Sequence, residues 1–489
     1  MTNENMEQLL DIGIALSGEK DFHKLLELIL SSVMKLTRCD AGTLYLLDED
    51  SLRFKIMRNN TLNTYEGGDG KDPSLPPVKL TRESVCALSL IEDRIICIDD
   101  VRASSEYDFS GPIRYDAITG YHTQSMLVIP MKNREGSKIG VLQLINAMDE
   151  NGQVCGFSKD MVKAVESVAS QAAITIQNVT YMQEIKDLFW SFVRVMSSAV
   201  DERTPYNLSH TRHMAEYGER FLDYLNEVEK KKTGKRRFDE AHQEEILMSV
   251  WLHDIGKLVT PLEVMNKEAR LDERTLEQIR HRMERIDMLA QIDVLKGELS
   301  EQSYEEIKEK TAQALALIEK SNRAGFLPDE TLEQIKAIKA CTYLWQGEEH
   351  PWLTDEELAL LSIRKGTLSD EERKIMENHV VVTRKLLSQI KFSKEFSNVQ
   401  KWAAGHHELL NGSGYPNHLA GEDIPQEIRI ITILDIFDAL VADDRPYKPG
   451  MPVEKALAIL DAMANKEGKL DPKLTGLFAE SRCWESIGD

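Results

Sequence analysis

The chain has few cysteines and no long apolar run. Its 489 residues contain six scattered cysteines without a Cys-x-x-Cys pair. Such thiols indicate neither a disulfide framework nor a cysteine-based zinc site, and they are typical of a reducing compartment. No stretch reaches the roughly 18 consecutive apolar residues that a transmembrane helix needs, and the opening MTNENMEQLLDIG lacks the basic region of a secretory signal. We therefore expect a cytoplasmic protein without a membrane span.

Basic charge is also scarce. Lys and Arg number 60 against 82 Asp and Glu, which gives a net charge of -22. Binding to nucleic-acid polymers depends on basic surface, so we expect no such partner. A small anionic substrate is not excluded, because a metal and a few local cations can dominate a pocket. The one basic run, KKKTGKRR at 230–237, is interpreted as a solvated loop.

The N-terminal part predicts a mixed domain. Residues 6–37 have apolar residues at helical spacing and predict two helices. The stretches that follow predict strands by their alternation and turn residues: AGTLYLLDED, LRFKIMRNN, DRIICIDD, QSMLVIPMK and KIGVLQLINA. We expect a compact α+β domain over residues 1–180, with an antiparallel sheet and flanking helices.

A long helix is predicted next. Apolar residues from 161 to 200 alternate steps of four and three, with one break at Lys186: Met161, Val165, Val168, Ala172, Thr175, Val179, Met182, Phe189, Val193, Met196 and Val200. This spacing is typical of an a/d seam. We interpret the 161–200 helix as a parallel homodimer seam, with residues 181–200 as the connecting coiled coil. The alternative is a single helix packed on its own domain.

Everything beyond residue 200 predicts helix, so we expect an all-α domain over residues 201–489. A faint internal repeat, LDERTLEQIR at 271–280 and LPDETLEQIK at 327–336, marks a helical insertion at about 270–365. The sequence leaves the role of this insertion open.

Histidines and acids in this second half indicate chemistry. Asp435 interrupts an almost unbroken apolar helix, and a buried carboxylate must be paired or bind a metal. His253-Asp254 follows the apolar run ILMSVWL in the same way. Any one of these residues alone would be interpreted as structural. Together the candidates are His210, His253, Asp254, His379, His406, His407 and Asp435.

Five imidazoles and two carboxylates exceed what one metal ion needs. They suit two divalent transition metals, with iron or manganese favoured and zinc, nickel or cobalt left open. A two-metal centre generates hydroxide and stabilises both oxygens of an in-line phosphoryl displacement. The sequence therefore predicts hydrolysis of a phosphate ester. No P-loop or GxGxxG motif indicates an organic cofactor.

Three longer motifs carry a resemblance to a known family. HDIGK at 253–257, HHELLNGSGYP at 406–416 and DIFDALVADDRPYK at 435–448 closely resemble the HD-GYP family of HD-domain phosphohydrolases. The resemblance covers most of residues 190–465. It implies an all-helical fold, a binuclear or trinuclear metal centre, and hydrolysis of cyclic di-GMP to pGpG or GMP.

The resemblance also assigns roles. It makes the seven candidate residues metal ligands, with Asp254 as the bridging carboxylate, and it makes Lys257 a catalytic residue that contacts the substrate phosphate. It implies that Arg445 and Lys448 hold the other phosphate or a guanine. The loop with Gly412, Gly414 and Tyr415 is expected to bind substrate, since glycine lets the backbone approach closely.

The chain departs from the family pattern at three places. His281 has the usual spacing after the HD pair, but His379 has the local sequence of the ligand; we favour His379 and keep His281 as the alternative. Tyr206 stands where trinuclear members carry a Glu, so we expect two metals, with three left open. Asn411 replaces the more common Asp.

A second resemblance lies in SKIGVLQLINAMDENGQVCGFSKDM at 137–161, which is similar to GAF sensor domains. Asn146, Phe157 and Asp160 keep a cyclic-nucleotide signature, whereas Ala147 and Met161 depart from it. A small-molecule sensor and a dimerisation scaffold both stay open, and so does the identity of a GAF ligand.

These observations predict a homodimeric, GAF-regulated, metal-dependent phosphodiesterase that hydrolyses cyclic di-GMP. One alternative is an HD phosphohydrolase for another cyclic dinucleotide or nucleotide. The other is a catalytically silent nucleotide-binding signalling module.

Overall fold

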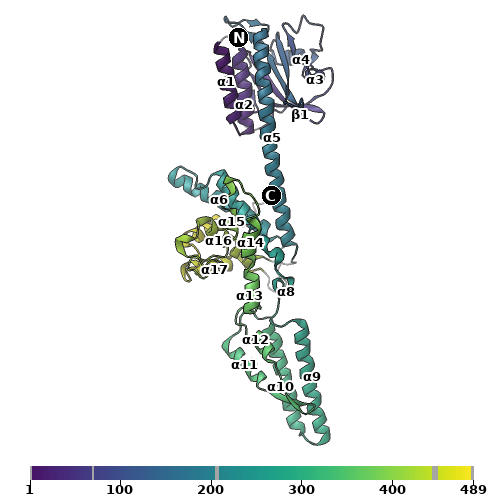
Figure 1. The fold of residues 1–489 in the computed structure, drawn as a ribbon, viewed down its shortest axis with the longest axis vertical. Coiled ribbons are helices and arrows are strands. Elements are labelled where there is room, and N and C mark those ends of the chain that lie inside the picture. The colour runs from purple at the N-terminus through teal and green to yellow at the C-terminus, as the bar shows by residue number, and fades with distance from the viewer. Residues whose placement is uncertain (1–2, 69–70, 204–208, 443–449, 486–489) are drawn as a thin grey trace. The chain divides into compact units, whose positions relative to one another are not determined.

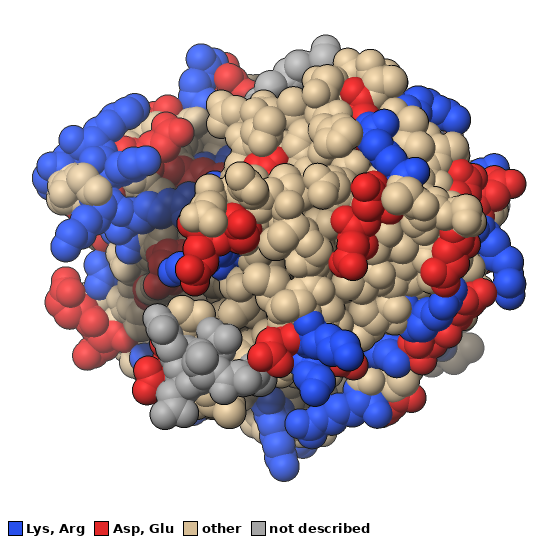
Figure 2. All heavy atoms as spheres, turned by 90° about the horizontal axis from the view of Figure 1, so that it is seen from above, with Lys and Arg blue, Asp and Glu red and all other residues tan. Residues whose placement is uncertain are grey.

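The computed structural model describes residues 3–68, 71–203, 209–442 and 450–485 (Figure 1). The chain divides into two compact units, Met1–Phe189 and Trp190–Asp489, which are described separately. No helix in the described part of the chain is long and apolar enough to cross a bilayer. All six cysteines are unpaired. On the face drawn in Figure 2, acidic and basic side chains are interspersed with broad uncharged areas.

The first unit contains the predicted antiparallel sheet. Its strands run in the order β3-β2-β1-β7-β6-β5, with β4 paired to β2. β1 and β2 form the predicted hairpin, and the turn around Gly136, with φ 82°, joins β6 to β7. The strands are β1 (Ala41–Asp48), β2 (Ser51–Asn59), β3 (Thr64–Glu66), β4 (Val78–Lys79), β5 (Ile96–Ile98), β6 (Met126–Lys132) and β7 (Lys138–Ile145), and a separate pair is β8 (Ala147–Met148) with β9 (Val154–Cys155).

Helices cover both faces of this sheet. α1 (Asn3–Gly18), α2 (Phe22–Thr37) and the first half of α5 (Lys159–Asp201) lie side by side (Figure 1), and their buried side chains share one core with Leu144. α3 (Val85–Glu92) packs on the other face with Val141, and α4 is Ser110–Thr119. Val141 and its neighbour Leu142 on β7 thus lie in different cores, as a pleated strand requires. The expectation of an α+β domain is confirmed.

Burial along α5 changes the interpretation of the predicted seam. Val165, Val168 and Ala172 are buried in the core of their own unit, so their apolar repeat serves that core. Val193 and Val200 are also buried. A different set of α5 residues is exposed, again in steps of four and three: Tyr181, Ile185, Leu188, Phe192 and Val195.

The second unit is built mainly from helices. α16 packs against α6, α17 and α18, where the rings of Phe221, Phe437 and Phe478 meet at centroid distances of 5.3 and 5.0 Å. Burying such aromatic side chains is a large source of stability. The elements are α6 (His210–Thr233), α7 (Glu240–Leu252), η1 (Ile255–Val259), α8 (Leu262–Met265), α13 (Asp370–Glu377), α14 (His379–Leu387), η2 (Lys394–Phe396), α15 (Val399–Ala403), η3 (Gly421–Asp423), α16 (Gln426–Val441), α17 (Val453–Asn465) and α18 (Pro472–Ser481).

The predicted insertion has a core of its own. It comprises α9 (Glu273–Lys296), α10 (Glu301–Asn322), α11 (Asp329–Lys339), β10 (Thr342–Trp345), β11 (Glu348–Pro351) and α12 (Asp355–Leu361). The buried guanidinium of Arg270 donates to the carbonyls of Ile363, Ser321 and Ala324, which fastens both ends of the insertion together.

The β10–β11 hairpin corrects the expectation that no strand occurs beyond residue 200. Gln346 and Gly347 form its turn with φ values of 56° and 87°, the left-handed pair that suits a two-residue hairpin. The sequence signal was the dipeptide Gln-Gly between short aromatic stretches.

Candidate metal centre

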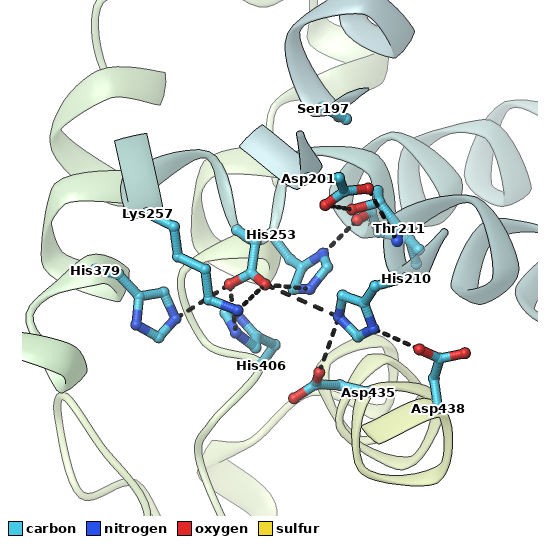
Figure 3. Close-up of polar contacts among 12 residues, drawn as sticks. Ser197, Asp201, His210, Thr211, His253, Lys257, His379, His406, Asp435 and Asp438 are labelled. Atoms are coloured by element: carbon cyan, nitrogen blue, oxygen red, sulfur yellow. Dashed lines mark hydrogen bonds and ion pairs between the residues drawn. The ribbon is translucent and has the colours of Figure 1, made fainter. Parts of the chain in front are cut away.

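Seven predicted ligand residues lie around one small volume. Figure 3 labels five of them: His210, His253, His379, His406 and Asp435. They come from five separate segments. His210 opens α6, His253-Asp254 lies between α7 and η1, and His379 opens α14. His406-His407 follows α15, and Asp435 lies within α16. Six of the seven are buried, and the side chain of His407 is 25% exposed.

The histidines form two groups. His379, His406 and His407 make one, and His210 and His253 with Asp254 make the other. Within each group the available ligand atoms lie within 4.8 Å of one another. Each group can therefore offer three donors to one ion.

Asp254 and Asp435 lie between the groups. Asp254 Oδ1 lies 3.3 Å from His379 Nε2 and 3.8 Å from His406 Nε2, and its Oδ2 lies 3.2 Å from His253 Nε2. Asp435 Oδ1 lies 3.4 Å from His210 Nε2, and its Oδ2 lies 3.6 Å from His407 Nδ1. Each carboxylate thus turns one oxygen toward each group, as a bridging ligand does.

Hydrogen bonds orient the imidazole rings. The Nδ1 atoms of His253, His379 and His406 lie 2.6, 2.7 and 2.6 Å from backbone carbonyls. A carbonyl only accepts, so Nδ1 carries the proton and Nε2 keeps its lone pair for the centre. Asp438 orients His210 in place of a carbonyl: its Oδ2 accepts from His210 Nδ1 at 2.6 Å, so Nε2 of this ring is the nitrogen that faces the centre.

The inward atoms fit metal ions. The Nε2 atoms of His253, His379 and His406 and Oδ1 of Asp254 are buried without a hydrogen-bond partner. Such atoms are costly unless something binds them. Donors that share one ion at about 2.1 Å lie about 3.0–3.4 Å apart, which is close to the nitrogen–oxygen distances found here. The donor set therefore fits bound metal ions.

The protonation states of the histidines differ between the two groups. Burial lowers the pKa of His407 to about 4 and the pKa of His406 well below its usual range, so both imidazoles are neutral near pH 7. Burial also acts to lower the pKa of His210, but Asp435 and Asp438 outweigh it and raise that pKa to about 10. His210 consequently holds a proton that an incoming ion must displace.

The acids of the centre are ionised. Burial opposes the charge on Asp254, yet Lys257 and His253 hold the pKa of its carboxyl well below the usual range. Lys257 Nζ lies 2.5 Å from Asp254 Oδ2, and its side chain is 18% exposed. A cation thus stands beside the Asp254 carboxylate, with part of its side chain open to solvent.

A turn explains how the adjacent residues His406 and His407 can both face the centre. α15 ends at Ala403, so His406 and His407 lie in turn geometry and both rings face the centre, 4.1 Å apart between centroids. Gly414 passes close behind them, and a Cβ there would lie 2.4 Å from the His407 carbonyl oxygen. The Tyr415 ring lies 4.7 Å from that of His407.

Other predicted site residues are placed as follows. Gly412 lies at the turn of the same loop with φ 77°, and a hydrogen bond from Asn411 Nδ2 to the Glu467 carbonyl anchors this loop. His281 is 68% exposed on α9, 3.9 Å from Glu277, and it is not among the residues of either group. Arg445, Lys448 and Tyr206 lie outside the described residues.

Sequence reasoning missed the residues that hold the ligands in place. Thr383 Oγ1 accepts from Gly256 N at 2.9 Å and donates to the His253 carbonyl at 3.0 Å, which clamps α14 to the HD segment. Gly256 allows this contact, since a Cβ there would lie 1.9 Å from the His379 carbonyl oxygen. Asp438 could have been found, because it lies three residues after Asp435 on one face of α16.

The signature asparagine of the first unit has a structural role. Asn146 has φ 57°, its Nδ2 donates to the His122 carbonyl, and its Oδ1 accepts from Gln124 N and Ser125 N. These bonds brace the chain between α4 and β6. The presence of this asparagine therefore has an explanation that needs no nucleotide.

Comparison with known proteins identifies both domains. The GAF domain model matches residues 21–176, and the HD domain model matches residues 355–474. The chain therefore carries an N-terminal GAF domain and an HD domain, as its motifs predicted. The HD match includes His379, His406, His407 and Asp435, and the folded chain adds His210, His253 and Asp254 from outside the matched range.

Curated relatives match over about a hundred residues. The 3'3'-cGAMP-specific phosphodiesterase 3 of Vibrio cholerae is 38% identical over 110 residues, which are 22% of this chain and 23% of that protein. The cyclic di-GMP phosphodiesterase response regulator RpfG of Xanthomonas campestris is 37% identical over 123 residues, 24% of this chain and 31% of its own length. A probable cyclic di-GMP phosphodiesterase of Vibrio cholerae is 36% identical over 121 residues, 24% and 27% of the two chains. The chain thus spans less than a third of each of these relatives.

Proposed function

We propose that this protein is a metal-dependent phosphodiesterase that hydrolyses cyclic di-GMP to pGpG, GMP or both. The observation that carries the proposal is the arrangement of Asp254 and Asp435, which each turn one oxygen toward each histidine group. Carboxylates in that position hold two ions as a pair. The curated relatives with this HD region act on cyclic dinucleotides, according to their names.

The two ions are proposed to be iron or manganese, which accept mixed imidazole and carboxylate ligands. When bound, they supply an activated hydroxide and neutralise charge on the phosphate oxygens. We assign His379, His406 and His407 to one ion and His210 and His253 to the other. His281 has no place in this assignment, because it lies exposed on α9.

Lys257 is proposed to hold a non-bridging oxygen of the substrate phosphate through Nζ. Its present partner is Asp254 Oδ2 at 2.5 Å. Bound ions would offset the charge of Asp254, which would leave the ammonium group of Lys257 available to the phosphate. There it stabilises the negative charge that develops as the phosphorus–oxygen bond breaks. Gly412, Gly414 and Tyr415 are proposed to form the adjoining loop against which a base lies.

A substrate panel tests this assignment. The full-length protein, loaded anaerobically with Fe(II) or Mn(II), is incubated with cyclic di-GMP, 3'3'-cGAMP and linear pGpG, and the products are separated by chromatography. We expect turnover of cyclic di-GMP. The relatives named for cGAMP favour that dinucleotide as the second candidate substrate. Turnover of cGAMP alone would replace the substrate assignment, and loading with metal but no turnover of any nucleotide would indicate a silent binding module.

We also propose that the chain forms a parallel homodimer along α5 and that the GAF domain tunes activity in response to a small molecule. The exposed residues Ile185, Leu188 and Phe192 follow the heptad spacing of a seam. Leu188→Glu should shift the sedimenting species from dimer to monomer, because it places a charge on the seam. Glu184→Gln, on the same exposed helix, is the control. A monomeric wild type would refute the dimer.

A further inference from the structure

The end of α5 contributes polar side chains to the layer of residues directly behind the metal centre. Ser197 and Asp201 are 3% and 5% exposed, although the same helix carries exposed apolar residues as far as Val195. Figure 3 shows Asp201 beside Thr211, at the side of the cluster away from Asp435. Neither residue is a predicted ligand, and their burial calls for a structural or functional explanation.

Asp201 caps the helix that begins with His210. The residue at the usual capping position, Ser209, makes no capping hydrogen bond with its side chain. Asp201 supplies the missing acceptor from another helix: Oδ2 accepts from Thr211 N at 3.4 Å, and Oδ1 accepts from Thr211 Oγ1 at 3.0 Å. A negative charge at a helix N-terminus is favourable. The first turn of α6, and with it His210, is thus anchored to the end of α5.

Arg203 closes the turn that carries Lys257. Its guanidinium donates to the carbonyl oxygens of Lys257 and Leu258, and its Nη2 donates to the Thr260 carbonyl at 3.2 Å. Lys257 and Leu258 lie in the last turn of η1 and Thr260 follows it; the Lys257 carbonyl also accepts from Thr260 N at 3.1 Å. η1 follows Asp254 directly, so Arg203 fixes the segment that joins the bridging carboxylate to the catalytic lysine.

Ser197 makes the third connection. Its Oγ donates to the carbonyl of Trp251, two residues before His253. The end of α5 therefore bonds to three backbone segments that carry His210, His253-Asp254 and Lys257.

We propose that Ser197, Asp201 and Arg203 are positioning residues, and that the end of α5 sets the spacing between His210 and the 253–257 segment. The proposal rests on the metal centre proposed above. Its consequence is that the position of α5 controls how tightly the His210 group binds its ion. Ser197 and Asp201 lie in the last turns of α5, the helix whose first half fills the GAF core.

Metal binding by the full-length protein tests the proposal without reference to turnover. Mn(II) affinity and stoichiometry are measured by competition with a chelator and by electron paramagnetic resonance. Asp201→Asn should weaken the binding of one of the two ions about 10- to 100-fold, the range seen when groups behind metal ligands are removed. The adjacent and exposed Glu202→Gln is the matched control and should bind both ions as the wild type does.

Two further pairs of variants separate positioning from general destabilisation. Thr211→Ser keeps the hydroxyl that Asp201 accepts from and should retain metal affinity, whereas Thr211→Val should lose it to the same extent as Asp201→Asn. Arg203→Lys and Arg203→Met both remove the three-carbonyl contact and should lower kcat for cyclic di-GMP with less effect on Mn(II) binding. Thermal unfolding reports the stability of each variant.

The outcomes are distinguishable. Unchanged Mn(II) affinity in Asp201→Asn, or equal loss in Thr211→Ser and Thr211→Val, would overturn the positioning role. If the wild type binds two Mn(II) ions tightly but hydrolyses no cyclic di-GMP, the proposed function fails while the effect of Asp201 on binding still supports positioning. A wild type that binds neither Mn(II) nor Fe(II) overturns both proposals.

Discussion

Replacing Asp438 with Asn should weaken the binding of one metal ion and leave the binding of the other unchanged. The Asp438 side chain is 1% exposed, and its Oδ2 lies 2.6 Å from His210 Nδ1. Asn has nearly the same shape but no charge, so it makes His210 a weaker base. The other histidine group orients its rings without Asp438: His379 and His406 donate to backbone carbonyls. The loss should therefore be confined to the ion held by His210 and His253.

The magnitude follows from the role of the carboxylate. Removing an outer partner of a metal-bound histidine typically costs 10- to 100-fold in affinity. That range corresponds to about 1.4–2.7 kcal/mol. The assay is an anaerobic Mn(II) titration of the full-length protein, in which the wild type should bind two ions per chain. Asp438→Asn should show one site with wild-type affinity and one weakened site.

The control is Asp461→Asn, the same substitution at an exposed position on α17. It should leave both sites unchanged. If Asp438→Asn weakened both ions equally, the two groups would not be independent, and the assignment of His210 to a separate ion would be wrong. If it changed neither, the hydrogen bond to His210 would have no influence on binding.

Four further outcomes follow from the same geometry. Gly256→Ala places a Cβ 1.9 Å from the His379 carbonyl oxygen. Overpacking of this kind lowers the free energy of unfolding by about 1–3 kcal/mol or more, so the midpoint of thermal unfolding and the metal content should both fall. An unchanged midpoint would contradict this contact. Asp435 and Asp438 outweigh the effect of burial and raise the pKa of His210 to about 10. An incoming metal ion must therefore displace one proton, and its affinity should rise about tenfold per pH unit between about pH 6.5 and 8.5. A metal affinity that does not change with pH would exclude that proton. His379→Ala should lose one ion by elemental analysis, whereas His281→Ala should lose none, and the reverse result would restore the alternative ligand. One alanine inserted after Gln183 rotates the remainder of α5 by about 100° about the helix axis and should change activity. Seven inserted residues nearly restore the original rotation and should leave activity unchanged. Equal changes in activity for both insertions would argue against transmission through α5.

Much of the first domain could be predicted from local sequence. The strands around residues 41–59 and 126–145 alternate clearly, and the turn at Asn133–Gly136 has its own residue signal. The role of α5 was less accessible, because a helix that packs on its own domain and a helix that dimerises share one apolar spacing. Only burial separates Val165, which fills a core, from Leu188, which is 71% exposed.

The candidate ligands were accessible from sequence because the motifs that contain them are long. Their arrangement was not. Sequence alone does not reveal that Asp254 and Asp435 face both histidine groups, or that His406 and His407 lie in a turn rather than in a helix. Thr383 and Arg203 bond to backbone groups of segments far away in sequence, and Asp201 bonds to Thr211 at no helical spacing, so no spacing rule points to them.

The most direct test of the account is one combined measurement on the wild type and Asp254→Ala. Both proteins are loaded anaerobically with Fe(II) or Mn(II), analysed for bound metal, and incubated with cyclic di-GMP. We expect two ions per wild-type chain and release of pGpG or GMP, and we expect Asp254→Ala to lose metal together with activity. Two ions retained by Asp254→Ala, or intact cyclic di-GMP after incubation with the fully loaded wild type, would contradict the account.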